Sequence, residues 1–429
     1  MRVLIGVAHS FGEKVMMLWI GRAFLGLVVA SVLSAGAMAQ QTVKIGAIYP
    51  LSGNAASAGN YSKAAIELGV DIVNNAYPDL KDLPLAATQG LPGLNGAKIE
   101  VVFADNQGTP AAGQNQALRL ITEEKVVALL GAYQSGITVT ASAMAEKHGI
   151  PFLTPESVAA NLTERGFKWF FRTTPVAGDI AKAYMAFLKE RKAGGIKIET
   201  IAIVNENSEY GTSIATVVKD EAVKSGFNVA LVIPYPANTT DVQPQVLQLK
   251  EKNPDVVVFV SYTSDAILYA KTMKDLSYKP PILIADNAGF NDPSFVKTSG
   301  ALVEGLINRS SFAAGKPGSL SAAINEMYKK KMGVDLDDPS GRALQGLLTL
   351  AEAINRAGAT DPAKIQAALR ATDLKASQVV TGYNGVKFDE KGQNTLGSSL
   401  ITQMQGGTYV PVWPADKAAG EIKLPYKGW

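Results

Sequence analysis

Cysteine is absent from the 429-residue chain, and histidine occurs only as His9 and His148. The lack of thiols excludes disulfide bonds, thiolate metal sites, a cysteine nucleophile and a lipid-modified N-terminal cysteine. His148 stands at the expected C-terminal end of a helix. A histidine there typically serves as a cation that interacts with the helix dipole. Because the commonest catalytic side chains are scarce, the composition weighs against an enzyme.

A strong net charge is also missing. The formal charge is +3, and the first 39 residues carry +2 of it, which leaves +1 for the remainder. A chain with so little excess charge offers no basic surface for nucleic acid or for an anionic membrane. No G-x-G-x-x-G follows an apolar run, and the sequence contains no P-loop or H-E-x-x-H motif. We therefore expect no nucleic-acid partner, no cofactor and no metal ion.

Long apolar runs are limited to the N-terminus. The apolar residues 24–33 follow Arg22, and a small-x-small pattern ends at Ala39. This arrangement is typical of a secretory signal peptide, and the run is shorter than the roughly 20 residues of a membrane span. We therefore predict that residues 1–39 are a signal peptide and that the exported, soluble protein begins at Gln40.

Short apolar runs alternate with helix-period segments from residue 43 onward. This alternation predicts an α/β fold with doubly wound parallel sheets, and its repetition after residue 175 predicts two lobes. The predicted strands are 43–50, 99–104, 126–130 and 151–153 in the first block, and 198–205, 228–235, 256–261 and 282–285 in the second. The predicted helices include 63–74, 110–124, 210–225, 241–252 and 264–276, followed by a helical block over 320–371 and antiparallel strands between 381 and 412.

One stretch, 126–148, indicates where a ligand binds. Its apolar start predicts a strand buried on both faces, and a helical segment follows. Ser135 stands at the junction and Thr138 lies in the first helical turn. The unpaired N–H groups and the dipole at a helix start suit a small carboxylate, although Ser and Thr also cap helices in general.

Other candidates stand at further strand ends. Ligands of doubly wound sheets bind at the carboxyl ends of the strands. Those ends include Ser52, Tyr133 and the neighbouring pair Glu156 and Ser157. Tyr210 stands at the rim of the second block, where it starts a helix.

Several segments together resemble the leucine/isoleucine/valine-binding protein family. They are VKIGAIYPLSG at 43–53, GAYQSGITVTAS at 131–142, GIPFLTP at 149–155, Phe171-Arg172, and Asn205 with Tyr210-Gly211. Members of this family are periplasmic solute-binding components of ABC importers. The resemblance implies a type I periplasmic binding fold whose lobes close on a small organic acid or amino acid and deliver it to a permease in the inner membrane. It also implies a monomer.

The resemblance further implies the boundaries of the lobes. Three crossovers would fall near 173–175, 307–309 and 381–383. Lobe 1 would then comprise residues 40–173 and 308–381, and lobe 2 would comprise residues 174–307 and 382–429.

Site residues follow from the same resemblance. Ser135 and Thr138 match positions that hold a ligand carboxylate. Ser157, or one of its neighbours Glu156 and Val158, matches a segment that supplies amide and hydroxyl contacts. Tyr262 matches an aromatic contact from the second lobe.

The sequence departs from the family at the position expected to bind an ammonium group. Asn287 stands where amino-acid binders carry an acid for the α-ammonium group, and Asp286 is adjacent. If Asn287 faces the pocket, a neutral or plain carboxylate ligand is expected, because the counter-charge is lost. Two other functions stay open at this point: a ligand-sensing receptor domain, and an enzyme that uses Asp286 or Glu156 as a base.

Overall fold

The computed structural model describes residues 42–429. The predicted signal peptide, residues 1–39, and the predicted mature start at Gln40 lie outside the described residues. Within residues 42–429, no helix has both the length and the apolar character required to cross a membrane.

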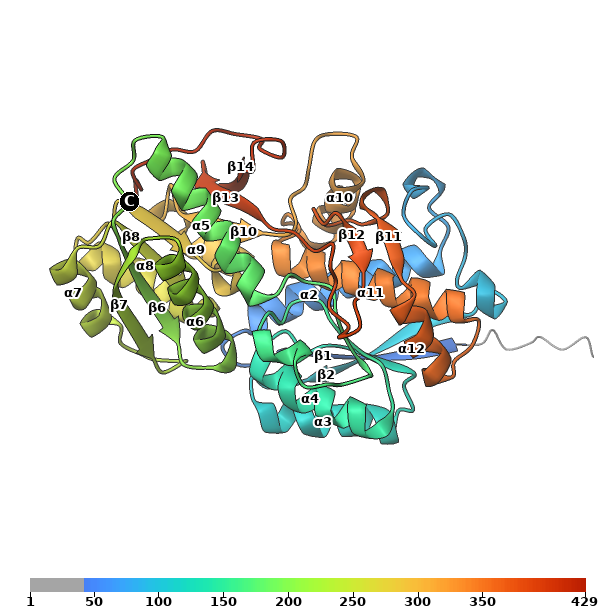
Figure 1. Cartoon of the computed structure of the whole chain (residues 1–429). Helices are drawn as coiled ribbons and strands as arrows, with labels where there is room; N and C mark the ends of the chain where they lie inside the picture. The colour runs from blue at the N-terminus through green and yellow to red at the C-terminus, as the bar shows by residue number, and fades with distance from the viewer. Residues whose placement is uncertain (1–41) are drawn as a thin grey trace, which may run out of the picture. The chain divides into compact units, whose positions relative to one another are not determined.

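The first half of the chain forms a five-stranded parallel sheet (Figure 1). Its spatial order is β2 (Lys98–Asp105), β1 (Thr42–Tyr49), β3 (Ala128–Gly131), β4 (Phe152–Thr154) and β5 (Phe170–Arg172). All four residues of β3 are buried, as expected for a parallel strand covered on both faces. The connecting helices are α2 (Ala56–Asn74), α3 (Pro110–Thr122) and α4 (Ser135–His148).

A second, seven-stranded sheet follows. Its spatial order is β14 (Thr408–Trp413), β13 (Leu400–Gln405), β10 (Ile307–Ser310), β9 (Ile282–Ala285), β8 (Val256–Val260), β6 (Thr200–Glu206) and β7 (Asn228–Tyr235). The last five strands in this order are parallel, whereas β13 and β14 are antiparallel. Two mostly parallel sheets confirm the predicted doubly wound α/β fold with two lobes.

Helices connect the strands of the second sheet. They are α5 (Ala177–Ala193), α6 (Glu209–Lys224), α7 (Gln243–Lys252), α8 (Thr263–Asp275) and α9 (Pro293–Ser299). Each predicted helix of this block matches one of these, but the sequence interpretation included neither α5 nor α9. The sequence interpretation also included no strand at β5.

The C-terminal part of the chain returns to the first sheet. It contains α10 (Leu320–Met332), α11 (Asp338–Ala357), α12 (Pro362–Arg370) and a small antiparallel pair, β11 (Asp373–Lys375) and β12 (Gly385–Lys387). Figure 1 shows α11 in orange lying along α2 in blue. The two helices approach closely because Gly69 has no side chain: a Cβ there would lie 2.8 Å from Leu344 and from Leu347.

The end of β5 is also held by a late segment. Gln393 forms a bridge with Arg172, and Asn394 Nδ2 donates to the Thr173 carbonyl at 3.0 Å. Asn394 also donates to the Gly385 carbonyl at 3.2 Å. Residues 385–394 therefore lie beside the first sheet.

Candidate ligand-binding site

A small polar cavity lies at the carboxyl ends of strands from both sheets. The space not filled by atoms there is about 280 Å³, which includes space open to solvent. Its lining residues are Tyr133, Ser135, Glu156, Tyr210, Tyr262, Asn287, Ala288, Arg309 and Arg342. The first three follow β3 and β4 and are called here the first-sheet wall. The next five follow β6, β8 and β9 or belong to β10 and are called the second-sheet wall. Arg342 comes from α11.

The first-sheet wall includes the start of α4. Ser135 is the first residue of this helix and is 1% exposed. The preceding Gln134 makes no side-chain capping bond, and the first amides of a helix have no partner within it. Ser135 Oγ accepts a long bond of 3.4 Å from the Ala159 amide and can still donate its own proton. This helix start therefore suits a carboxylate group.

Glu156 is the buried carboxyl group of the same wall. Tyr49 Oη donates to Oε1 at 2.8 Å, and Oε2 is buried with no partner among residues 42–429. Burial raises the pKa of Glu156 to about 8, although the Arg342 guanidinium and the Tyr49 hydrogen bond both act to lower it. At neutral pH the free protein therefore holds Glu156 mostly as the neutral acid.

Arg309 supplies a cation from the second-sheet wall. Its Nε lies 2.9 Å from Asp286 Oδ1, and both side chains are at most 2% exposed. Asp286 also accepts hydrogen bonds from Tyr184 Oη at 2.7 Å and Tyr210 Oη at 2.8 Å, so both of its oxygens are occupied. Arg309 Nη1, in contrast, is buried and makes no hydrogen bond within the described chain.

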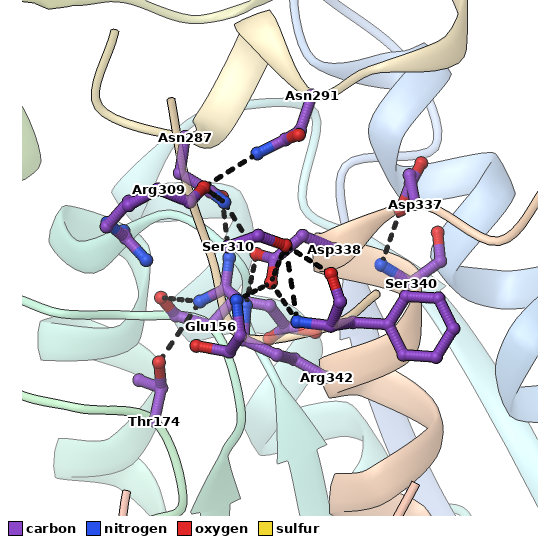
Figure 2. A network of polar contacts seen from close by, with 12 residues as sticks. Glu156, Thr174, Asn287, Asn291, Arg309, Ser310, Asp337, Asp338, Ser340 and Arg342 are labelled. Atoms are coloured by element: carbon purple, nitrogen blue, oxygen red, sulfur yellow. Dashed lines mark hydrogen bonds and ion pairs between the residues drawn. The ribbon is translucent and has the colours of Figure 1, made fainter. Parts of the chain in front are cut away.

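Arg342 connects the two walls (Figure 2). Its Nε lies 2.8 Å from Asp338 Oδ2, and both side chains are buried. Its Nη1 donates to the Glu156 carbonyl at 3.1 Å and to Thr174 Oγ1 at 3.2 Å, and its Nη2 donates to Asn287 Oδ1 at 2.8 Å. Both terminal nitrogens of this guanidinium are therefore hydrogen-bonded to protein groups, and Nε makes the ion pair with Asp338 without forming a hydrogen bond.

Asp338 is the anion at the centre of this network. Its carboxylate accepts hydrogen bonds from the Ser311 and Phe312 amides and from Asn287 Nδ2, the last at 2.6 Å. Burial acts to raise the pKa of Asp338, but the two guanidinium groups of Arg342 and Arg309 and these hydrogen bonds hold it below its usual value. Asp338 is thus a permanent anion that balances Arg342.

Asn287 lines the cavity with its polar atoms occupied. Besides Asp338, its Nδ2 donates to the Arg309 carbonyl at 3.0 Å, while its Oδ1 accepts from Arg342. Its backbone has a φ of 47°. Two residues further on, a Cβ at Gly289 would lie 2.2 Å from the Thr263 amide, so only glycine allows this turn to pack on the start of α8.

Three tyrosine rings form the aromatic part of the lining. The ring centroid of Tyr262 lies 5.4 Å from that of Tyr210 and 6.2 Å from that of Tyr133. Burial raises the pKa of each phenol well above its ordinary value, so all three stay neutral. Tyr133 Oη is buried and, within residues 42–429, unpaired.

The comparisons with known proteins identify the family. A family model described as "Periplasmic binding protein" matches residues 42–408. The chain belongs to the periplasmic binding protein family. A curated relative, the Leu/Ile/Val-binding protein homolog 7 of Brucella suis, is 32% identical over 94% of this chain and 98% of its own length. Membership in a family of binding proteins confirms both the predicted resemblance and the prediction that the chain is not an enzyme.

Solved structures share the fold of this periplasmic binding protein. The branched-chain amino acid transporter substrate binding protein LivJ from Streptococcus pneumoniae, in complex with isoleucine, gives a TM-score of 0.73 at 22% identity and covers 90% of this chain and 100% of its own. A solute binding protein of an ABC transporter from Rhodopseudomonas palustris, in complex with 3,4-dihydroxy benzoic acid, gives 0.72 at 18% identity and covers 90% of this chain and 98% of its own.

The structure brings most of the predicted site residues of this periplasmic binding protein together. The predicted residues that line the cavity are Tyr133, Ser135, Glu156, Tyr210, Tyr262 and Asn287. They come from strand ends of both sheets, as the sequence analysis expected for a doubly wound fold.

Thr138 and Ser157 lie behind the lining. Their hydroxyl oxygens are 2.6 Å apart. Thr138 Oγ1 also accepts from the Ala132 amide at 3.1 Å, and Ser157 Oγ donates to the Tyr133 carbonyl at 3.0 Å. Both hydroxyls are therefore occupied by protein groups in this structure. Through these contacts they hold the loop that carries Tyr133.

Two further predicted residues lie outside the lining. Asp286 is buried behind Arg309, which it holds in place. Ser52 is exposed, and its Oγ donates to Asp105 Oδ2 at 2.7 Å. Of the adjacent pair Asp286 and Asn287, it is therefore Asn287 that reaches the cavity.

The sequence analysis did not identify Arg309 or Arg342 as site residues. The sequence does contain a signal for Arg342. It lies near a helix start, where a positive charge is unfavourable, and Asp338, four residues earlier, is placed to pair with it. Arg309 carried no comparable local signal, because its partner Asp286 is distant in sequence.

Proposed function

We propose that this protein is the periplasmic substrate-binding component of an ABC importer for a small carboxylate-bearing solute. The observation that carries the proposal is a set of three buried polar atoms, Tyr133 Oη, Glu156 Oε2 and Arg309 Nη1, each without a partner among residues 42–429 and each from a residue that lines one cavity. Buried polar groups are nearly always hydrogen-bonded, so a bound solute is expected to supply the partners.

The groups that line the cavity favour a small acid that also has an apolar part. Ser135 and the start of α4 suit the carboxylate, and the three tyrosines offer an apolar surface to the rest of the solute. A branched-chain amino acid or a similar aliphatic or aromatic acid fits these features.

Capture proceeds by closure of the two lobes around the solute. Direct contacts already join the two halves: Ser57 Oγ in α2 donates to Asp292 Oδ1 at 2.7 Å, and Asn161 Nδ2 donates to Glu209 Oε1 at 2.8 Å. A solute held by both walls contacts all of its partners only in such a closed form. Binding therefore shifts the population toward it, and the permease receives the closed form.

The remaining features belong to the same proposal. Residues 1–39 direct export to the periplasm and are removed, and the mature protein is a monomer. The lobes divide at a first crossover near 173–175, as expected from the sequence, and at a second crossover after residue 310, because β10 (Ile307–Ser310) belongs to the second sheet. We place the third crossover after residue 394 instead of near 381–383, because Asn394 and Gln393 bond to the end of β5.

A thermal-shift screen tests the function. Amino acids, aromatic acids and short aliphatic acids are added to the protein, and a bound solute raises the melting temperature by mass action without being consumed. Chemical conversion of the solute, or no shift with any of these acids, would refute the proposal.

The variant Ser135→Ala tests the carboxylate position. We expect an affinity loss of tenfold or more by calorimetry, because a hydrogen bond to a charged group contributes about 1.5–3 kcal/mol. Ser142→Ala removes a hydroxyl from the same helix outside the lining and should leave the affinity unchanged. Equal affinities of the Ser135→Ala variant and the unmodified protein would remove Ser135 from the site.

A further inference from the structure

Several carboxyl groups lie in or beside the cavity, and they differ in what occupies their oxygens. Protein donors occupy both oxygens of Asp286, of Asp338 and of Glu206. Glu156 differs because Oε1 accepts from Tyr49 while Oε2 is buried and, in the described part of the chain, unpaired. Glu156 is therefore the carboxyl group in position to receive a cationic group of a solute.

Glu156 lies close to Ser135, the proposed carboxylate position, and this placement fits the ammonium group of an α-amino acid. Ser135 and Glu156 follow β3 and β4, which are neighbouring parallel strands of the first sheet. Neighbouring strands lie about 4.8 Å apart. An α-amino acid carries its carboxylate and its ammonium on one carbon, so the two groups can be received side by side at two adjacent strand ends.

We propose that Glu156 binds the α-ammonium group of the solute, and that capture of an amino acid releases the Glu156 proton to solvent. The neutral carboxyl group of the free protein loses its proton, and the resulting carboxylate pairs with the ammonium. The inference rests on the proposed function and specifies its solute class. Asn287, which stands at the position expected to carry this acid, is occupied by Arg342 and Asp338 instead.

The charges around the cavity support this exchange. Arg309 is paired with Asp286 and Arg342 with Asp338, so these four groups cancel. A zwitterion beside ionised Glu156 then has the same total charge as a plain carboxylate beside protonated Glu156. The same cavity can hold either kind of acid, and the two complexes differ by one proton.

The neighbours of Glu156 determine when it ionises. Tyr49 from β1 and Tyr133 from the loop after β3 face it, together with Arg342 and Asp338 from α11. The tyrosines stay neutral, and Arg342 lowers the pKa of Glu156 more than Asp338 raises it. Burial nevertheless dominates and raises the pKa of Glu156 to about 8, which falls within an experimentally accessible range.

Two solute pairs test the inference by calorimetry between about pH 6 and pH 8.5, on either side of the Glu156 pKa. The pairs are L-leucine with 4-methylpentanoate, and L-phenylalanine with 3-phenylpropanoate; the members of each pair differ only in the amino group. Because only the ionised protein accepts the ammonium, the affinity for the amino acid should rise about tenfold per pH unit below pH 8 and then level off. The affinity for its deaminated partner should stay constant and then fall above pH 8.

Proton release gives an independent readout. Binding measured at pH 7 in buffers of different ionisation enthalpy should release nearly one proton with the amino acid and none with the deaminated acid. Glu156→Gln keeps an acceptor for Tyr49 but cannot ionise. In this variant proton release should disappear and the amino-acid affinity at pH 8.5 should fall more than tenfold. Binding of the deaminated acid should be unchanged, which also shows that the variant is folded.

Tyr49→Phe serves as the matched variant outside the cavity. Tyr49 is fully buried and stabilises ionised Glu156 without lining the site. Its loss should move the pH profile for the amino acid to higher pH without changing the affinity for the deaminated acid.

The possible failures separate the two proposals. Tight amino-acid binding without pH dependence or proton release would overturn the role of Glu156 and leave the proposed function intact. Binding of the deaminated acids alone, at every pH, would also overturn the role of Glu156 and leave the proposed function intact. Failure of all four acids to bind at any pH would overturn both proposals.

Discussion

The two walls of the cavity are built on opposite principles. In the second-sheet wall, Arg309 and Asn287 are held by ion pairs and hydrogen bonds to buried Asp286 and Asp338, so their positions are fixed before a solute arrives. In the first-sheet wall, Ser135 and Glu156 make few contacts with protein groups. Protein contacts fix most polar atoms of the second-sheet wall and leave Arg309 Nη1 unpaired among residues 42–429, whereas the first-sheet wall leaves most of its polar atoms for the solute.

This difference agrees with the location of two unusual features, a strained backbone conformation and a carboxyl group with a shifted pKa. Asn287, in the second-sheet wall, adopts a left-handed φ of 47° that the surrounding bonds must hold. Glu156, in the other wall, has a raised pKa because it is buried. Changes in the two walls should therefore affect different quantities: stability for the second-sheet wall, and solute choice or pH dependence for the first.

The largest expected effect comes from breaking the rigid network. Asp338→Asn leaves the Arg342 guanidinium buried without its counter-ion, and breaking a buried pair in this way costs about 3–5 kcal/mol. The free energy of unfolding from urea titration should fall by that amount. Glu67→Gln removes a carboxylate from the half-exposed pair with Lys331 and should cost much less. Similar losses in the two variants would mean that the network does not stabilise the fold.

The next effect is a pH dependence that belongs to the other wall. The pKa of Glu156 is about 8 in the folded protein, whereas its ordinary value is 4.5. Between these two pH values the folded state keeps the Glu156 proton and the unfolded state releases it. Its contribution to stability is complete below pH 4.5 and is lost as the pH rises toward 8, by about 1.4 kcal/mol per pH unit.

The variant Glu156→Gln isolates that contribution. Burial also raises the pKa of Asp337 to about 7 and of Asp265 to about 6, so the unmodified protein has several sources of pH dependence. The difference in unfolding free energy between the variant and the unmodified protein, measured from pH 5 to 8 without solute, reports Glu156 alone. Parallel profiles for the two proteins would contradict a buried, protonated Glu156.

The sequence predicted the first-sheet wall better than the second for a physical reason. The strand before Ser135 is a run of buried apolar residues, and the helix after it is regular, so local pattern alone locates the junction. The same logic could have found α5, whose buried residues Ile180, Tyr184 and Leu188 recur every four positions. That helix was missed although its pattern is present.

The second-sheet wall depends on contacts between distant residues. The segment 307–310 is rich in polar residues, and the sequence analysis treated it as a crossover, yet all four residues of β10 are buried. Arg309 is accommodated there only because Asp286, on the neighbouring strand end, neutralises it. A single sequence does not reveal such a pairing, so the prediction recognised Asp286 but assigned it to the solute.

The smallest effect concerns a contact that belongs to neither wall. Ser57 Oγ donates to Asp292 across the two halves of the protein, outside the cavity lining. Its loss in Ser57→Ala should weaken the closed form by about 1 kcal/mol, or about fivefold in affinity, because a hydrogen bond contributes about that much. The loss should be equal for leucine and 4-methylpentanoate, since neither touches Ser57, whereas Glu156→Gln should discriminate between them.

Ser52→Ala is the matched control, because the Ser52 hydroxyl bonds to Asp105 within the first half. An affinity loss in the control would return Ser52 to the binding site, and an unequal loss in Ser57→Ala would show that the closing contact also selects the solute.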